Sequence, residues 1–275
     1  MMLAKDKTRP LVMGIVNVTP DSFSDGGQYH NAEHAISHAR SLIGAGADIL
    51  DIGGESTRPG AAPVSVEDEL DRVMPVIEGL GRETPIPISI DTMKPAVACA
   101  AIGAGAALWN DVSALRGTSD ALQTAADLNV SIVLMHMQSK PGVMQIAPIY
   151  DDVVAEVIAF LNARTDAAIK AGVKPDNIFV DPGIGFGKTL DHNLALMRAL
   201  PRIRSETGRP LLFGASRKRF IEMLCPDTPA DQRLGGSLAS ALYAAQAGAE
   251  IIRVHDVAQT VQALTVWRAI DGASS

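Results

Sequence analysis

Short runs of hydrophobic residues alternate along the chain with longer segments in which hydrophobic residues recur at helical spacing. Eight such runs are evident, at 11–17, 48–53, 86–91, 107–111, 131–137, 178–181, 211–214 and 251–255. Most are continuously apolar and lack the in–out alternation of a half-exposed antiparallel strand. They therefore predict parallel strands in a sheet that helices cover.

The segments between these runs predict amphipathic helices. Hydrophobic residues from Val66 to Leu80 recur at intervals of three and four, and Ser65 with Asp68 forms a capping-box signature at the start of that segment. The same spacing appears at 35–43, 153–161 and 257–264.

Eight β-then-α units predict a (β/α)8 TIM barrel, of the α/β class, in which one domain spans 1–275 with a core of about 10–270. A doubly wound open sheet is the alternative, but it typically has fewer strands and needs a topological switch point. In a barrel, the loops at 19–27 and 55–63, each directly after a strand, lie on the face where active sites are built.

Composition and charge narrow the class of protein. The 275 residues are 47% hydrophobic with a net charge of −7, which argues against broad binding to nucleic acid or anionic membranes. Cys99 and Cys225 are the only cysteines, too few for a disulfide framework or a four-cysteine zinc site. No apolar run approaches the roughly 20 residues of a membrane span, and nothing near the N-terminus resembles a signal peptide. We expect a cytoplasmic protein.

Polar residues stand at the end of almost every predicted strand. They are Asn17, Asp51, Glu55, Asp91, Asn110, Asp111, His136, Asp181, Ser216, Arg217, Lys218, Arg253 and His255. A single one could be the N-cap of the next helix, but their repetition at one rim predicts a convergent polar pocket.

These polar residues divide by charge. Acids and amides end the first, third, fourth and sixth strands, whereas basic groups end the seventh and eighth, where barrels most often bind phosphate. Carboxylates and amides suit a planar heterocycle with N–H donors, and the basic groups suit an anion. The pattern therefore predicts a phosphorylated heterocycle as substrate.

Two further motifs carry less weight. Residues 183–189 look like a phosphate-binding loop, but Pro182 stands where a Walker A pattern needs glycine, so we expect a flexible loop there. His30, His34 and His38 share a predicted helix face; without a supporting carboxylate, a solvated face is favoured over a metal site.

Seven blocks in order along the chain carry a family resemblance. They are GIVNVTPDSFSDGG (14–27), DIGGESTRPGA (51–61), ISIDT (88–92), NDVS (110–113), DPGIGFGK (181–188), SRK (216–218) and RVHDV (253–257). The chain resembles the dihydropteroate synthases, the pterin-binding enzymes, over essentially its whole length. The resemblance implies a transferase of folate biosynthesis that condenses 6-hydroxymethyl-7,8-dihydropterin pyrophosphate with 4-aminobenzoate, giving 7,8-dihydropteroate and pyrophosphate.

The resemblance also implies roles for individual residues. The pterin would be bound by Asp91, Asn110, Met135, Asp181 and Lys218. The pyrophosphate would be bound by Asn17, Thr57, Arg58, Arg253 and His255, with Asn17 also holding Mg²⁺. The 4-aminobenzoate would be bound by Phe23, Arg58, Pro59, Phe186 and Lys218, and Asp25, Asp181, Lys218 and Arg253 would be catalytic. The loops 19–27 and 55–63 resemble mobile segments that close over the site, the alternative being rigid Ω-loops, and family members are commonly homodimers.

In the implied reaction, pyrophosphate leaves early and the ring-binding carboxylate of Asp181 stabilises the cation. The arylamine is neutral at pH 7, so no general base is needed, and none of the Ser–His or Cys–His type is expected. After Lys218 the family often has a small residue, whereas Arg219 stands here; it could point toward the aminobenzoate carboxylate or into solvent. A pterin-binding methyltransferase and a catalytically silent pterin-binding paralogue are the alternative functions.

Overall fold

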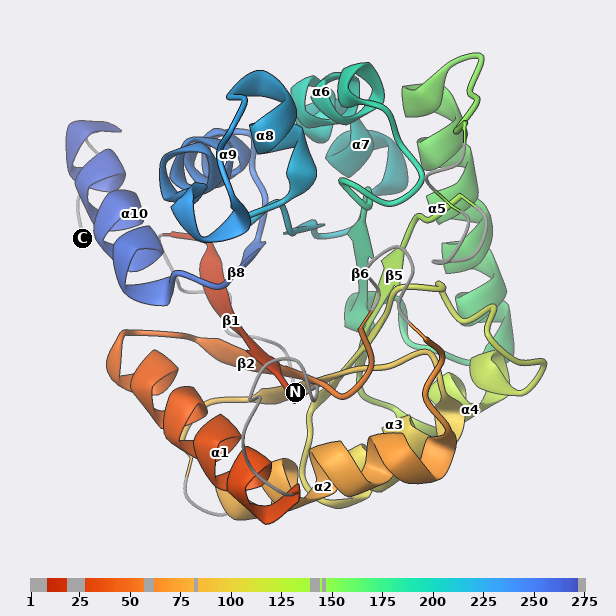
Figure 1. Ribbon diagram of the computed structural model, residues 1–275. Helices are drawn as coiled ribbons and strands as arrows, with labels where there is room; N and C mark the ends of the chain where they lie inside the picture. The colour runs from red at the N-terminus through yellow and green to blue at the C-terminus, as the bar shows by residue number, and fades with distance from the viewer. Residues whose placement is uncertain are drawn as a thin grey trace.

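The computed structural model describes residues 9–18, 28–56, 62–81, 84–138, 144 and 147–271. Its described residues form a barrel of eight parallel strands surrounded by helices, which Figure 1 shows as a ring of helices around the strands. The predicted (β/α)8 fold is therefore confirmed.

The strands occupy the predicted hydrophobic runs, trimmed by up to two residues. They are β1 (Leu11–Asn17), β2 (Ile49–Gly53), β3 (Ile88–Asp91), β4 (Leu108–Asp111), β5 (Ser131–Met135), β6 (Ile178–Asp181), β7 (Leu212–Phe213) and β8 (Ile251–Val254). Their order in the sheet is β6-β5-β4-β3-β2-β1-β8-β7. A parallel bridge between Val180 and Leu211 closes the barrel between β6 and β7.

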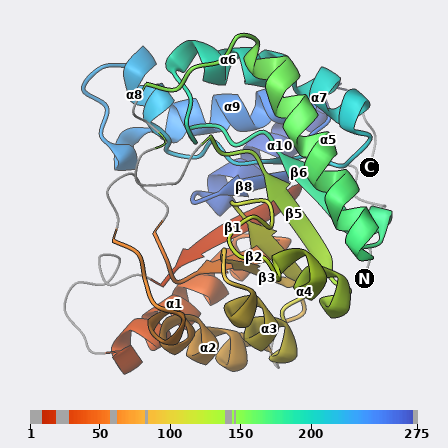
Figure 2. The same ribbon diagram turned by 90° about the vertical axis from the view of Figure 1, so that its right-hand side faces the viewer.

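Helices follow each strand and cover the outside of the barrel, as the side view in Figure 2 also shows. They are α1 (Gln28–Gly44), α2 (Val66–Gly81), α3 (Pro95–Gly103), α4 (Ala121–Leu128), α5 (Val153–Ala171), α6 (Leu190–Arg198), α7 (Leu200–Thr207), α8 (Arg219–Leu224), α9 (Leu234–Gln246) and α10 (Val257–Asp271). Short 3-10 turns lie at Pro175–Asn177 and Ala230–Gln232. Two helices follow β6 and two follow β7; the other strands are each followed by one.

Capping side chains explain where some helices begin. The Ser65 hydroxyl accepts the backbone N–H of Asp68 at 3.0 Å, as predicted, but it also donates to the Asp68 carboxylate at 2.8 Å. The capping box is therefore closed through the serine hydroxyl rather than through its backbone N–H. The Asp152 carboxylate accepts the N–H groups of Val154 and Ala155 at the start of α5.

Successive strand residues pack on opposite sides of the sheet. One apolar cluster, drawn from seven strands, fills the inside of the barrel: Met13, Ile49, Leu108, Val133, Phe179, Leu212 and Ile251. Their strand neighbours, such as Val12, Leu50 and Ile252, belong to the larger cluster between the sheet and the helices. The continuous apolar runs thus contribute to two hydrophobic cores, one inside the barrel and one between the sheet and the helices. Each strand presents alternate residues to the barrel interior.

Candidate functional site

Polar residues form the layer of the barrel interior directly above its apolar filling. In four strands a polar residue stands two positions after an inner apolar one, the pairs being Ile49 and Asp51, Leu108 and Asn110, Phe179 and Asp181, and Ile251 and Arg253. Because side chains alternate with a period of two, each polar residue points to the same inner side. Asp91, in register with Gly53 and Asn110, adds a fifth.

A buried network joins four of these residues. The Arg253 guanidinium donates from Nε to Asp51 Oδ2 at 2.6 Å and from Nη2 to Asp91 Oδ2 at 2.8 Å. Asn110 Nδ2 also donates to Asp51 Oδ2, at 3.1 Å. Because the amide nitrogen is held in this way, the Asn110 carbonyl oxygen is presented as an acceptor.

Burial and charge act in opposite directions on this network. Burial raises the pKa of Asp91, with Arg253 opposing the rise and the neighbouring carboxylate of Asp51 adding to it. Burial disfavours the charge of Arg253, but Asp51 and Asp91 outweigh it, so the pKa of Arg253 is raised. The guanidinium therefore stays charged, and it can form ion pairs either with these two acids or with an incoming anion.

The opposite wall comes from β6 and from the turn after β7. Asp181 is buried, and its Oδ1 accepts the N–H of Gly183 at 2.7 Å. Burial raises the pKa of Asp181, and Lys218 opposes the rise. Burial also lowers the pKa of Lys218 to about 8, while Asp181 opposes that fall. The ammonium group donates to the Ile184 carbonyl at 2.5 Å and lies 4.6 Å from the centre of the Phe186 ring.

The glycine-rich segment 183–187 is tightly packed, in contrast to the flexible loop expected from its composition. Ile184 is fully buried, and the Gly185 N–H donates to Asn193 Oδ1 at 2.7 Å. Lys188, which a Walker A loop would turn toward phosphate, is instead buried, with its Nζ 2.9 Å from His136 Nδ1. The pKa of Lys188 is lowered by burial to about 7, and that of His136, also by burial, to about 3.

A serine and a histidine are in hydrogen-bonding contact beside β8. Ser216 Oγ lies 3.0 Å from His255 Nδ1 and accepts the backbone N–H of His255 at 3.2 Å. The hydroxyl has one proton and two lone pairs, so it can donate to Nδ1 or accept from it, according to the tautomer of the ring. In either case the contact orients the imidazole.

The predicted division of the rim by charge is only partly correct. Arg253 comes from the basic side but pairs with Asp51 and Asp91, because its long side chain reaches across the barrel. Arg217 pairs with Asp256, at the start of α10, through two hydrogen bonds of 3.0 and 2.5 Å. Lys218 and His255 remain as the other basic groups at this side.

Two strand-end residues support the structure instead of lining the pocket. Asp111 is fully buried, and its two oxygens accept the N–H groups of Ser113 and Leu115 at 2.7 and 2.8 Å. It stands one position after Asn110, so it points to the helix side of the sheet. His136 pairs with Lys188 behind the glycine-rich segment.

Other residues of the predicted site lie near the same mouth. Met135, at the end of β5, is buried with Val112, Met137 and Met144, and Phe186 packs against this cluster. Asn17 ends β1 in register with Gly53 and is half-buried. Arg219, which the sequence left unassigned, is exposed at the first position of α8.

Several predicted residues lie outside the described part of the chain. They are Phe23, Asp25, Thr57, Arg58 and Pro59, together with most of the loops 19–27 and 55–63. The side chain of His30 also lies outside it, whereas His34 and His38 are exposed on α1.

The donor set for a metal ion is sparse. Within the described ranges, no group of three or more His, Cys, Asp or Glu side chains could hold a metal. Mg²⁺ commonly takes only one or two protein ligands and completes its shell with phosphate oxygens and water. The amide oxygen of Asn17 fits that pattern, whereas a structural zinc site does not.

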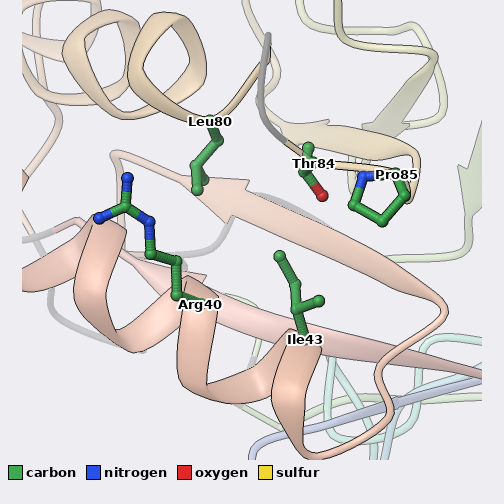
Figure 3. A pocket seen from close by; sticks show the side chains of 5 residues that line it. All are labelled: Arg40, Ile43, Leu80, Thr84 and Pro85. Atoms are coloured by element: carbon green, nitrogen blue, oxygen red, sulfur yellow. The ribbon is translucent and has the colours of Figure 1, made fainter.

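A surface cavity of about 180 Å³ lies away from this mouth. It is lined by Arg40 and Ile43 of α1, Leu80 of α2, and Thr84 and Pro85, as Figure 3 shows. The last two residues precede β3, so the cavity lies near the amino ends of the strands, opposite the face where barrel enzymes bind substrates. It is therefore separate from the candidate site.

Three residues at or next to the mouth received no role from the sequence, although Asp51 and Ser216 were among the polar residues at strand ends. Asp51 is a mid-strand carboxylate, Ser216 is a strand-end hydroxyl, and Lys188 closes the glycine-rich motif. The signal for Asp51 was present, because a carboxylate inside an otherwise apolar strand must be paired or line a polar cavity. Ser216 and Lys188 needed knowledge of partners far away in sequence.

Comparison with known proteins identifies the relatives of this chain. A family model described as pterin binding enzyme matches residues 13–255. The dihydropteroate synthase of Neisseria meningitidis serogroup B is 50% identical over 269 residues, which is 95% of this chain and 93% of the relative.

Solved structures agree with the sequence relatives. The dihydropteroate synthase of Xanthomonas albilineans with 4-aminobenzoic acid has a TM-score of 0.90 and 55% identity, covering 96% of this chain and 94% of that one. The same enzyme in complex with 7,8-dihydropteroate has a TM-score of 0.87 and 52% identity, with 96% and 94% covered.

Proposed function

The chain belongs to the pterin-binding enzyme family, and we propose that its barrel mouth condenses 6-hydroxymethyl-7,8-dihydropterin pyrophosphate with 4-aminobenzoate. The products are 7,8-dihydropteroate and pyrophosphate, so the enzyme is a dihydropteroate synthase-type transferase. One observation carries the assignment: the buried Asn110 and Asp181 and the partly buried Asp91, Lys218 and Arg253 converge on one mouth of the barrel. The relatives described above are synthases, which does not favour a methyltransferase or a silent paralogue.

The pterin ring is placed against the acceptors of the mouth. The Asp91 and Asp181 carboxylates and the Asn110 carbonyl oxygen accept hydrogen bonds from ring N–H groups, and Lys218 supplies a donor. Met135, in the apolar cluster beside Asp181, forms one wall of the ring site. Orientation of Asn110 by Asp51 is supported by the 3.1 Å hydrogen bond between them.

The leaving group is placed at the basic side of the mouth. Arg253 and His255 donate to the pyrophosphate, and Thr57 and Arg58 are assigned to the same group by the family pattern. As the carbon–oxygen bond to pyrophosphate breaks, the Asp181 carboxylate stabilises the positive charge on the pterin. Catalytic roles thus fall to Asp181, Lys218 and Arg253, with Asp25 added by the family pattern.

The amine of 4-aminobenzoate then attacks the exocyclic carbon. A carbon–nitrogen bond forms, and the amine proton passes to the departing pyrophosphate or to water. Phe186 and Lys218 line this side, and Phe23, Arg58 and Pro59 are assigned to it by the family pattern. The cation–π contact between Lys218 and Phe186 supports an aromatic acid there, because it combines an apolar ring face with a positive charge.

Enzymes of this family use a divalent metal, and we assign Mg²⁺ as that metal here. Asn17 would hold it, through its amide oxygen. When bound, Mg²⁺ neutralises charge on the pyrophosphate leaving group.

Two further properties are part of the proposal. We infer a homodimer, because exposed apolar side chains such as Leu224, Tyr243 and Ile270 lie on the late helices α8, α9 and α10. We infer a cytoplasmic location, because Cys99 and Cys225 are free and exposed. No described helix is long and apolar enough to cross a membrane.

The test of the function is a two-substrate assay. The purified protein with Mg²⁺ is expected to release pyrophosphate and form 7,8-dihydropteroate only when both substrates are present. Omission of 4-aminobenzoate, with the pterin pyrophosphate present, is the control for simple hydrolysis. Absence of product at saturating substrates would refute the proposal.

A further inference from the structure

The glycine-rich segment 183–187 is held by side chains from several separate elements. The Ile184 carbonyl accepts from Lys218 at 2.5 Å, the Phe186 carbonyl from Lys188 at 2.9 Å, and the Gly187 carbonyl from Tyr150 Oη at 2.8 Å. These three donors come from the turn after β7, from the segment before α6 and from the segment before α5. Hydrogen bonds to three of its carbonyls, from donors outside the segment, thus restrict the conformation of the loop.

Lys188 is the most deeply buried of these three donors. Its side chain is 4% exposed, and its Nζ lies 2.9 Å from His136 Nδ1 and 3.4 Å from the His136 carbonyl. Burial keeps His136 neutral, so Nδ1 offers a lone pair to the lysine. Lys188 thereby ties the Phe186 carbonyl to the end of β5.

The backbone of the loop lies directly against the residues after β5. A Cβ at Gly183 would stand 1.9 Å from the His136 carbonyl oxygen, and one at Gly187 would stand 2.9 Å from the Gln138 carbonyl oxygen. Both glycines have positive φ, of +70° and +64°. Without the Lys188 link, the Phe186 carbonyl loses its side-chain donor, whereas the contacts of the loop with Lys218, Tyr150 and Asn193 remain.

We propose that Lys188 is a positioning residue that fixes the Phe186 ring against the Lys218 ammonium and thereby sets the affinity for the arylamine substrate. This rests on the proposed function, in which Phe186 and Lys218 form the aminobenzoate side of the mouth. In this proposal Lys188 itself contacts neither substrate. It acts through the backbone carbonyl of Phe186, the same residue whose ring it positions.

The first test uses Lys188→Met in the free enzyme, with hydrogen exchange measured by mass spectrometry. Amide exchange in peptides covering 183–187 is expected to accelerate by about tenfold or more, because a loop that has lost its donor at the Phe186 carbonyl opens more often. Each opening breaks the hydrogen bonds of the Gly185 and Phe186 N–H groups to Asn193 and Gly183. Exchange in β1 and β2 is expected to stay unchanged. Unchanged exchange across 183–187 would overturn the proposal whether or not the enzyme has the proposed activity.

The second test separates the two substrates kinetically. In Lys188→Met the KM for 4-aminobenzoate is expected to rise by about tenfold, equivalent to about 1.4 kcal/mol, with smaller changes in kcat and in the KM for the pterin pyrophosphate. Equal rises in both KM values, or a loss confined to kcat, would contradict a role in placing Phe186.

Two matched variants complete the design. Lys170→Met, at an exposed lysine of α5, controls for the loss of a positive charge and is expected to behave as the wild type. Lys188→Gln retains a hydrogen-bond donor without charge and is expected to recover part of the aminobenzoate affinity; it also serves as the test protein if Lys188→Met does not fold. No recovery in a folded Lys188→Gln would count against a hydrogen-bonding role. Inactivity of the wild type would refute the proposed function and leave the exchange test to decide on Lys188.

Discussion

His255 is positioned by a neighbouring hydroxyl. Ser216 Oγ accepts the His255 backbone N–H at 3.2 Å and lies 3.0 Å from Nδ1, and these two contacts hold the ring in one orientation. A serine hydroxyl has one proton and two lone pairs, so the contact with Nδ1 forms in either neutral tautomer. When Ser216 donates to Nδ1, the proton of the neutral imidazole resides on Nε2, and a donor there suits an anion.

Ser216→Ala should therefore weaken binding of the pterin pyrophosphate while leaving the pterin alcohol unaffected. Loss of the hydroxyl frees the imidazole ring to turn, and a lost hydrogen bond of this kind corresponds to about tenfold in affinity. Isothermal titration with each ligand measures both values, and His255→Ala serves as the reference for complete loss. Equal weakening of both ligands would show that Ser216 supports the fold alone.

The pH dependence of kcat/KM is expected to report the ionisation of Lys218. Burial lowers its pKa to about 8, and its ammonium group lies over the Phe186 ring. In the proposed function, the protonated form is the one that donates to the pterin. Because an ammonium loses its proton as the pH rises, kcat/KM should fall above about pH 8 and be retained below it. Steady-state rates between about pH 6 and 9.5 check this.

Lys188 is the group most easily confused with Lys218 in such a profile. Its pKa is lowered to about 7, also by burial, so the profile of Lys188→Met is the matched control. The alkaline fall should persist in that variant. If the fall in kcat/KM above about pH 8 disappears in Lys188→Met, it reports the ionisation of Lys188 rather than that of Lys218. That result would refute the proposed role of Lys218.

Helices and strands are connected by ion pairs that the residue pattern alone does not show. Lys94, just before α3, binds Glu69 of α2 and Glu55 after β2, each at 2.5 Å. Glu69 is fully buried, and Glu55 also accepts the N–H of Val64 at 3.1 Å. One lysine thus ties together the second and third β/α units, just after the carboxyl ends of β2 and β3.

Lys94→Met should destabilise the protein by about 3 kcal/mol, because removal of one partner leaves a buried carboxylate without its counter-charge. Chemical denaturation monitored by circular dichroism measures the change. In the double variant Lys94→Met/Glu69→Gln, part of the loss should be recovered, because the uncompensated charge is gone. Arg202→Ala, which breaks an exposed pair with Glu206 on α7, should cost less than about 1 kcal/mol and serves as the surface control.

Elements were predictable from sequence where a single local rule determines them. The strands followed from apolar runs, and α2 followed from its spacing and from Ser65, because these depend on near neighbours in the chain. Asp111 shows the limit: it ends β4 beside Asn110, yet strand alternation turns it to the helix side, where it binds backbone N–H groups. Polar residues at strand ends thus include both pocket and loop-supporting residues.

Partners distant in sequence were not predictable. Arg253 binds Asp51, 202 residues earlier, and Lys188 binds His136, 52 residues earlier. A single sequence shows which residues carry charge but not which ones the closed barrel brings together. This is why Arg253 was expected to face an anion alone, although it also neutralises two acids.

At the scale of the whole molecule, the barrel has a weakly paired seam between β6 and β7. β1 and β2 pair over five residues, whereas β7 has two residues and meets β6 through a single bridge, Val180 to Leu211. Fewer ladder hydrogen bonds make a strand pair easier to open locally. The seam separates Asp181, at the end of β6, from Lys218, in the turn after β7, so the substrate mouth spans it.

Hydrogen exchange should therefore be faster in β7 than in β1 and β2, although Leu212 and Phe213 are as deeply buried as the residues of those strands. Binding of the pterin pyrophosphate should slow exchange at β7 more than at β1 or β2, because a ligand held by Asp181 on one side and Lys218 on the other bridges the seam, and a ligand that binds only the closed form stabilises it by mass action. Exchange measured by mass spectrometry with and without the ligand checks both statements, with pyrophosphate alone as the control that contacts only the basic side. Equal protection of β7 and β1 in the free enzyme would show that side-chain burial, rather than the number of ladder hydrogen bonds, keeps the barrel closed.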